Sequence, residues 1–291
     1  MRSYLTKLGI LTLLICVALG SCARAGSLSI QPLRQELELK PGQTLNSFVL
    51  VTNTGNSPTI VSMSAESFGV INENYDYSFD KAQDVKSWVH FDETSAVIKP
   101  HDDHSFNYSI GIPITAEPGE KYIAIFASVN STSSDNVSVT DRVGELSYIT
   151  IAGNVTRRGK VLGLTVPFIT LSQQLSWDLR LENTGTAHFD SVITTNMTNA
   201  FDRTLSRKTE KHLILPATTR LLSNTVGLGS WPGLYHVKFL IGRGDDPASY
   251  VSRWVIYAPL WATIILVVAL ISVGEFFYRR HKKHRKYTIH S

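Results

Sequence analysis

The chain has 291 residues, 43% of them apolar, and a formal net charge of +4. Its basic character comes from the two ends. Between Gly26 and Arg253 there are 19 basic and 23 acidic residues, so this central part is weakly acidic. The charge balance therefore gives no reason to expect a nucleic-acid partner.

The first 25 residues have the plan of a secretory signal peptide. Two basic residues accompany the apolar stretch 8–19, and the small residues Ala23 and Ala25 precede a predicted cleavage site at Gly26. We therefore expect residues 1–25 to be removed and the following part to be exported.

The only cysteines, Cys16 and Cys22, lie within this predicted signal peptide. The exported part would then contain no disulfide and no thiolate metal site, and must depend on its hydrophobic cores. An alternative interpretation treats Leu19-Gly-Ser-Cys22 as a bacterial lipobox, which would place a lipid on Cys22. A chain with its own membrane helix hardly needs that second anchor.

The exported part reads as short strands separated by turns. Leu33, Leu37 and Leu39 alternate with polar residues before Pro41-Gly42, and similar runs end in Asn-x-Gly or Pro-Gly turns every eight to twelve residues. This pattern is typical of β-sandwiches. We predict one immunoglobulin-like sandwich over residues 26–155 and a second over 156–253, giving an all-β fold.

Three landmarks recur in the same order in both predicted sandwiches. Asn53-Thr-Gly55 returns as Asn183-Thr-Gly185, Ile98-Lys-Pro100 returns as Ile214-Leu-Pro216, and Pro118-Gly119 before Tyr122 returns as Pro232-Gly233 before Tyr235. Asn and Gly accept the positive φ of a strand-ending turn, and Pro-Gly closes a corner. The recurrence predicts two copies of one sandwich type. The tyrosines suggest a tyrosine corner, in which the hydroxyl binds backbone.

The first copy contains an additional segment rich in aromatic and acidic residues. It includes Phe68, Tyr75 and Trp88. These side chains either display a recognition surface or cover the edge of the sandwich, which is the interpretation we favour. Residues 80–88 are a weak candidate for a short helix.

The stretch from Trp254 to Gly274 contains no charged residue. A helix of this length spans roughly the 30 Å hydrocarbon core of a bilayer, so we predict a transmembrane helix over residues 254–274. The basic tail 275–291 that follows predicts a cytoplasmic end, and Trp254, Tyr257 and Trp261 are expected at the opposite interface. The alternative is a buried core helix followed by a nucleic-acid-binding tail.

Groups that resemble catalytic or metal-binding motifs are weak. Ser78-Phe-Asp-Lys81 and Ser134-Asp-Asn136 imitate two motifs of serine penicillin-binding enzymes, but Lys208-Thr-Glu210 lacks the glycine of the third. His101-Asp-Asp-His104 holds metal-ligand residue types, although a solvated turn is the interpretation that we favour. We assign no catalytic, cofactor-binding or metal-binding residue and expect no enzymatic activity.

The ordered set of motifs in the first copy also resembles a known family. The set comprises Leu33 to Gly42, the Asn53 turn, Ser87-Trp-Val, Ile98-Lys-Pro100, Pro118 to Phe126 and Arg142 to Gly153. It is similar to the first domain of bacterial WxL-interacting cell-surface proteins, whose fold is related to pilus-chaperone sandwiches. The resemblance implies a second sandwich, a membrane helix and a short basic tail. It also implies peptidoglycan attachment by the first domain and protein or host-matrix contact by the second.

These observations predict a single-pass cell-membrane protein with its amino-terminal part outside. Its expected partners are the membrane and either cell-wall polymer or surface proteins, with no nucleic acid and no cofactor. The alternative function is a membrane-tethered chaperone that binds surface subunits by strand addition. A third class, a hydrolase of wall material, would require Ser78 or the turn 101–104.

Overall fold

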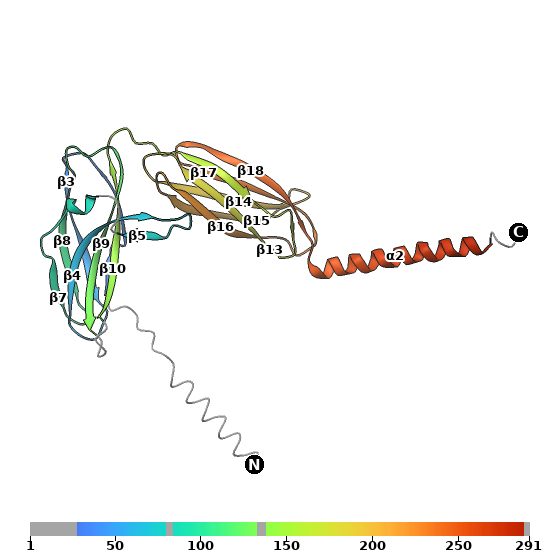
Figure 1. The fold of residues 1–291 in the computed structure, drawn as a ribbon, viewed down its shortest axis with the longest axis horizontal. Helices are drawn as coiled ribbons and strands as arrows, with labels where there is room; N and C mark the ends of the chain where they lie inside the picture. Colours follow the sequence, from blue (N-terminus) through green and yellow to red (C-terminus); the bar gives the residue numbers. More distant parts are fainter. Residues whose placement is uncertain (1–27, 80–83, 133–137, 288–291) are drawn as a thin grey trace, which may run out of the picture.

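A computed structural model describes residues 28–79, 84–132 and 138–287. It consists of two β-sandwiches in tandem and one carboxy-terminal helix, α2 (Leu260–Tyr287), as seen in Figure 1. The predicted all-β class with two immunoglobulin-like sandwiches is confirmed. The predicted signal peptide, both cysteines and the second enzyme-like motif, 134–136, lie outside the described residues.

The first sandwich packs a four-stranded sheet against a six-stranded sheet. The smaller sheet has the order β1 (Leu28–Gln31), β3 (Thr44–Asn53), β8 (Asp103–Gly111) and β6 (Val89–Phe91). The larger has the order β2 (Arg34–Leu39), β10 (Ser138–Ile151), β9 (Gly119–Thr132), β4 (Thr59–Val70) and β5 (Tyr77–Phe79), with β7 (Ser95–Ile98) also on β4. The chain thus changes sheets between β1 and β2.

The second sandwich has the same plan with fewer strands. Its three-stranded sheet has the order β11 (Gly159–Thr165), β13 (Gln174–Asn183) and β16 (Thr219–Gly227). Its five-stranded sheet has the order β12 (Ile169–Thr170), β18 (Asp246–Tyr257), β17 (Gly233–Arg243), β14 (Phe189–Asn199) and β15 (Thr204–Ile214). Here the chain changes sheets between β11 and β12, as it does in the first sandwich.

Alternating side chains fill each sandwich. In β13, Leu175, Trp177 and Leu179 are buried and their neighbours are exposed, which is the period of two expected of a strand with one wet face. The carboxyl half of β10 differs because Ile149 faces the core while Tyr148, on the opposite face, is also buried. Tyr148 is covered by the junction between the sandwiches.

The repeated Asn-Thr-Gly landmark is a structural tie common to both sandwiches. The Asn53 amide donates to the carbonyls of Ser57 and Ile98 at 2.8 and 3.1 Å, and the Asn183 amide donates to those of Ala187 and Ile214 at 2.9 and 2.8 Å. Each asparagine is 1% exposed. One buried side chain therefore joins the first landmark to the second in each sandwich.

The third landmark differs between the copies. Tyr235 lies in the second core and donates its hydroxyl to the Trp231 carbonyl at 2.6 Å, as a tyrosine corner requires. Tyr122 stands four residues after Pro118, whereas Tyr235 stands three after Pro232. A shift of one residue turns a strand side chain to the other face. The tyrosine-corner prediction is therefore wrong for Tyr122, which lies in the junction.

The charge-free stretch is divided between a strand and a helix. Residues 254–257 form the end of β18, where Tyr257 is 4% exposed in the second core. Trp254 stacks on His236 with ring centroids 4.3 Å apart. The helix begins only at Leu260, so the predicted start of the membrane helix at residue 254 is wrong. Apolar composition alone does not separate a buried strand from the helix that follows it.

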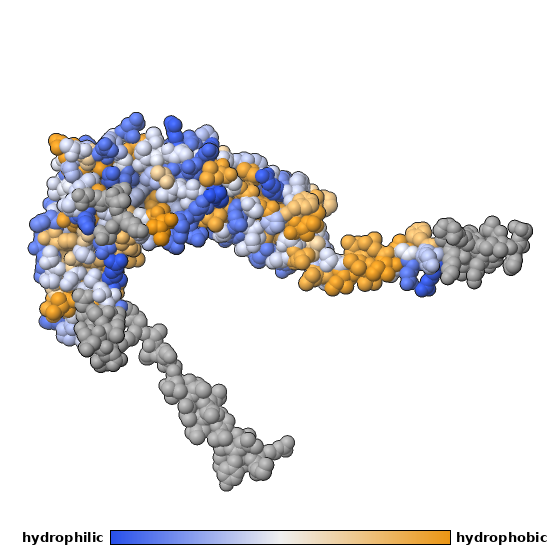
Figure 2. Space-filling view, viewed as in Figure 1, coloured by the Kyte–Doolittle hydropathy of each residue, from blue (hydrophilic) through white to orange (hydrophobic). Residues whose placement is uncertain are grey.

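The described helix remains long and apolar enough to cross a membrane. Its segment Leu260–Arg279 has 20 residues and a mean hydropathy of 2.2, and none of it is buried against the sandwiches. Figure 2 shows an apolar rod projecting from the end of the second sandwich. Twenty residues rise about 30 Å, which matches the hydrocarbon core of a bilayer.

Candidate binding surface around the sandwich junction

The additional segment of the first sandwich reaches across to the second. Strands β4 and β5 form a hairpin that extends beyond the first sandwich to the side of the second (Figure 1). At its tip, the Tyr75 hydroxyl lies 2.6 Å from Thr218 Oγ1 and accepts the Leu215 N–H at 2.8 Å. Tyr75 is 6% exposed. The hairpin therefore fastens the two sandwiches together.

Aromatic rings from the first sandwich form the apolar part of this junction. Phe68 lies within 5.3 to 5.7 Å of the rings of Tyr77, Tyr122 and Tyr148, and the cluster also includes Leu213 and Leu215 of the second sandwich. Burial raises the pKa values of Tyr75, Tyr122 and Tyr148. Their hydroxyls consequently stay protonated and can donate hydrogen bonds at any physiological pH.

Charged groups surround the hairpin tip. The Glu73 carboxylate forms an ion pair with Arg180, whose Nε donates to it at 2.9 Å, and hydrogen bonding to Arg180 lowers the pKa of Glu73. The Glu73 carbonyl accepts the Leu221 N–H at 2.8 Å. Arg220 stacks over the Tyr75 ring at 4.3 Å. The tip thus combines apolar, cation–π and backbone contacts with one body, the second sandwich.

A buried carboxylate forms the other half of the junction. Glu120, at the start of β9, accepts the His188 backbone N–H and the Tyr122 hydroxyl, each at 2.8 Å. The His188 ring also contacts this carboxylate through Nδ1, and His188 Nε2 lies 3.8 Å from Glu36 Oε2. Glu120 and His188 are both buried, so this hydrogen-bonded pair joins the two sandwiches inside the junction.

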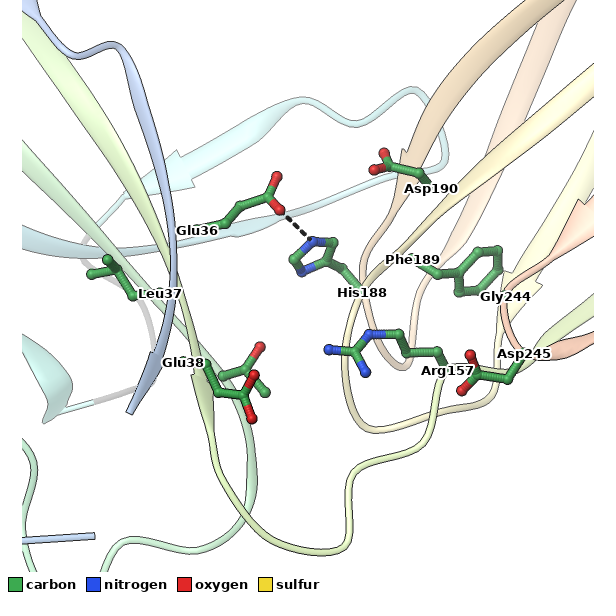
Figure 3. Close-up of a pocket in the computed structure, with 10 residues that line it drawn as sticks. Glu36, Leu37, Glu38, Arg157, His188, Phe189, Asp190, Gly244 and Asp245 are labelled. Atoms are coloured by element: carbon green, nitrogen blue, oxygen red, sulfur yellow. Dashed lines mark ion pairs between the residues drawn. The ribbon is translucent and has the colours of Figure 1, made fainter. Parts of the chain in front are cut away.

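A groove with a volume of about 450 Å³ lies beside the Glu120–His188 pair. Glu36 and Glu38 of β2 face Arg157 and His188 across it, with Asp245 beside Arg157 (Figure 3). Carboxylates therefore outnumber basic groups. The groove offers both hydrogen-bond donors and hydrogen-bond acceptors to a polar ligand, and less of its lining is apolar than polar.

The outer edge of β10 is open at its amino half. β2 pairs with Leu146–Ile151 only, and no described strand pairs with residues 141–145 on that side. The Leu146 N–H donates to the carbonyl of Leu33, just before β2, and the Ala152 N–H donates to that of Leu39 at the end of β2. Backbone groups alternate in direction along a strand. Arg142 and Gly144 therefore direct their N–H and C=O groups away from β9, toward the open side. Unpaired backbone groups of this kind can pair with an extended peptide.

The side chains along this edge are held in position. The Arg142 guanidinium donates to Glu66 at 2.9 Å and stacks over Phe126 at 4.2 Å. A side chain at Gly144 would meet Phe126 at 2.7 Å, so glycine lets the edge strand lie flat on that ring. Contacts within its own sheet therefore hold the open edge in place.

A buried glutamate faces the interior beneath this edge. Glu145 is fully buried and accepts hydrogen bonds from Tyr108 at 3.2 Å and from Ser147 at 3.0 Å. Burial raises its pKa to about 7, although both hydrogen bonds lower it. Burial and the nearby Glu145 also raise the pKa of Tyr108. The carboxyl is therefore partly neutral near physiological pH.

The structure separates the residues that resembled enzyme or metal motifs. Ser78 lies on β5, paired with Gly69. His101 contacts Asn56 Oδ1 at 3.1 Å, whereas His104 contacts Glu93 Oε2 at 3.0 Å. Within the described ranges, no group of three or more His, Cys, Asp or Glu side chains could hold a metal ion.

The aromatic residues of the additional segment serve the fold. Phe68 and Tyr75 are buried in the junction, so a recognition surface for an outside partner is wrong for these two. Trp88, at the end of the 3₁₀ helix η1 (Asp84–Trp88), packs against the first core. Of the weak helix prediction for residues 80–88, the described part, 84–88, is this short 3₁₀ helix.

Comparison with solved structures finds proteins of similar fold. The chain is similar to the class 5 fimbriae chaperone CfaA, with 11% identity, a TM-score of 0.39 and coverage of 80% of this chain and 100% of that one. It is also similar to the YadV chaperone, with 14% identity, a TM-score of 0.39 and coverage of 79% of this chain and 100% of that one. For the E. coli chaperone DraB the identity is 12%, the TM-score is 0.34, and the coverage is 81% of this chain and 98% of that one. At these values the likeness concerns the fold alone.

No family model matches the chain, and no curated protein matches it. The class defined by the structure is a protein of two linked immunoglobulin-like sandwiches followed by one helix of membrane-spanning length. Its two candidate binding features are the groove at the junction and the open edge of β10.

Sequence reasoning missed the groups that join the sandwiches. Glu120 and His188 are 68 residues apart, and Tyr75 and Leu215 are 140 apart. The available signal was the acidic and aromatic composition of the additional segment, which indicated a special surface without indicating what it contacts.

Proposed function

We propose that the chain is an exported, membrane-anchored binding protein that captures an extended segment of a surface protein along the open edge of β10. The observation that carries the proposal is the outward direction of the Arg142 and Gly144 backbone groups, with no strand beside them among the described residues. An added strand would satisfy these groups and continue the line of β2.

The anchor in this proposal is α2. Its apolar segment would cross the membrane, and the basic residues that follow would keep the carboxyl end in the cytoplasm. A cleaved signal peptide would place both sandwiches outside. The first sandwich would then present β10 away from the bilayer, because the second lies between it and α2 (Figure 1).

The second sandwich contains a comparable open edge. β12 pairs only with Ile256 and Tyr257 of β18, and the Ile256 N–H bonds to the Phe168 carbonyl. By the same alternation, Ser252 directs its N–H outward. We assign partner binding to β10 because the β18 edge ends beside the membrane helix.

A second candidate function uses the groove. Its carboxylates, Arg157 and His188 supply hydrogen-bond acceptors and donors suited to a polar wall polymer such as peptidoglycan. This matches the role implied by the resemblance to WxL-interacting proteins. Arg157→Ala should then weaken retention of the full chain on purified peptidoglycan, whereas strand-edge variants should not.

Strand capture is tested with a matched pair of substitutions at one position. Both Arg142→Pro and Arg142→Ala remove the guanidinium and its contact with Glu66, but only proline removes the outward N–H, at an edge position that tolerates proline. Purified full chain is incubated with proteins released from the surface of the source cells. Capture should persist with Arg142→Ala and be lost with Arg142→Pro.

Two results would contradict this assignment. Equal capture by both Arg142 variants would exclude backbone pairing at β10. Loss with Ser252→Pro, but not with Ser252→Ala or Arg142→Pro, would move the site to β18. A scaffold differs from a chaperone in the finished surface layer, where a scaffold still holds its client, whereas a chaperone has released it upon assembly.

A further inference from the structure

A very short linker joins the second sandwich to α2. β18 ends at Tyr257 and α2 begins at Leu260. The intervening Ala258 still donates its N–H to the Thr170 carbonyl of β12 at 2.9 Å. The three Cα–Cα steps from Tyr257 to Leu260 span at most about 10 Å. A membrane surface that α2 enters near Leu260 therefore passes close to this end of the sandwich.

Three connections meet at this end: residues 166–173, 200–203 and 228–232. Strand directions place them together, because β14 ends and β15, β17 and β13 begin there. They and the adjoining strand end expose large apolar side chains: Phe168, Ile169, Leu171, Phe201, Trp231 and Leu234. Phe201 is 89% exposed and Trp231 is 77% exposed.

The opposite end of the second sandwich has a different character. Two of its connections, 184–188 and 215–218, contact the first sandwich, and Ala187 and Leu215 are 0% and 1% exposed. Turns are ordinarily built from Gly, Pro, Asn, Asp and Ser. Exposed aromatic residues at the other end therefore call for a covering partner. Figure 2 shows apolar surface on that end, next to the base of α2.

Charge is nearly absent from the three connections. Only Asp202 and Arg203 carry charge there, and the Asp202 carboxylate is paired with Lys238 Nζ at 2.6 Å. Aromatic and aliphatic tips with few charges are the composition that sits at the boundary between headgroups and acyl chains.

We propose that this end of the second sandwich is a membrane-contact surface that places Phe168, Phe201 and Trp231 in the headgroup layer of the bilayer that α2 crosses. The inference rests on the proposed anchoring role of α2. The occupant is lipid because the apolar surface continues directly into the helix across two residues. Contact between the membrane and all three connections would fix the orientation of the sandwiches relative to the bilayer, which the two-residue linker alone would leave free to change.

The test uses full chain reconstituted in phosphatidylcholine nanodiscs, with and without dibrominated phosphatidylcholine, which quenches nearby tryptophan. The contribution of each tryptophan is the emission lost in the Trp231→Phe or Trp261→Phe variant. We expect the Trp231 contribution to the emission to fall by roughly half in brominated discs. The reason is that interfacial apolar side chains lie about 5 to 10 Å into the boundary between headgroups and acyl chains, within reach of the quencher. Quenching of Trp261 reports insertion of α2 separately.

Each outcome has a distinct meaning. Quenched Trp261 with unquenched Trp231 would overturn the membrane-contact surface and leave the anchor in place, and it would point to a protein partner. Unquenched Trp261 would overturn the anchor itself, and the membrane-contact surface with it. Quenching of both supports the proposal.

A charge substitution provides the second measurement. Phe201→Asp should reduce the quenching of Trp231, because an added carboxylate draws this end away from lipid. The matched control is Leu240→Asp, which alters a 48% exposed side chain within β17, away from the three connections. It should leave Trp231 quenching unchanged, and equal losses in both variants would refute a contact specific to this end.

Discussion

The buried Glu145 should make the first sandwich lose stability as pH rises. Its carboxyl lies between the sheets with a pKa raised to about 7 from an ordinary 4.5. The folded state therefore binds the proton more tightly than the unfolded state. The associated stability is complete below about pH 4.5 and declines as the pH rises to 7 and beyond.

The magnitude follows from the two pKa values. A tenfold change in proton affinity corresponds to about 1.4 kcal/mol, so the free energy of unfolding should fall by about 2 to 3 kcal/mol between pH 5 and pH 8 on account of this group. Glu145→Gln keeps an acceptor for Tyr108 and Ser147 but cannot ionise. The variant should therefore lack this part of the pH dependence.

The assay is urea denaturation of both proteins at pH 5 and pH 8. The difference in unfolding free energy between variant and wild type should shift by about 2 to 3 kcal/mol in favour of the variant at pH 8. That shift corresponds to about 1 to 2 M urea at the midpoint. The neutral buried carboxyl would be refuted if this difference in unfolding free energy were the same at both pH values, or if it shifted in favour of the wild type at pH 8.

Three further substitutions test the packing. Tyr75→Phe leaves the buried Leu215 N–H without its acceptor and should lower the free energy of unfolding by about 1 to 3 kcal/mol. Calorimetry should then show a larger difference between the melting temperatures of the two sandwiches. A single transition at the wild-type temperature would count against a stabilising contact between Tyr75 and the second sandwich. Asn183→Ala should destabilise the second sandwich by at least about 2 kcal/mol, since the Ile214 carbonyl loses its donor. A midpoint of unfolding at the same urea concentration as the wild type would contradict this. Tyr235→Phe should cost about 1 kcal/mol through the lost corner bond, and no loss would show that bond to be incidental.

Local features were predictable from sequence because neighbouring residues determine them. The turns after Asn53 and Asn183 were found from three-residue patterns, and the structure shows the same side-chain bonds at both. The error at Tyr122 arose from a landmark matched by residue type without counting the spacing from Pro118. In a strand, one residue of spacing decides which face a side chain occupies.

Long-range features were not predictable in this way. Nothing in the residues near Glu120 indicates that its carboxylate accepts the His188 N–H, because that contact depends on how two complete sandwiches pack. The open edge of β10 likewise depends on where β2 begins, at Arg34, opposite Leu146. Hydropathy located the membrane-length segment but included in it residues 254–257, the end of the last strand of the second sandwich.

The account depends most on both sandwiches lying outside a membrane that α2 crosses. Single cysteines at the exposed Ser64 and at Ser291 test this directly in intact cells, with the native chain as background for Cys16 and Cys22. A membrane-impermeant maleimide should label Ser64→Cys at once and Ser291→Cys only after lysis. Labelling of Ser291→Cys in intact cells, with Ser64→Cys protected, would contradict the account.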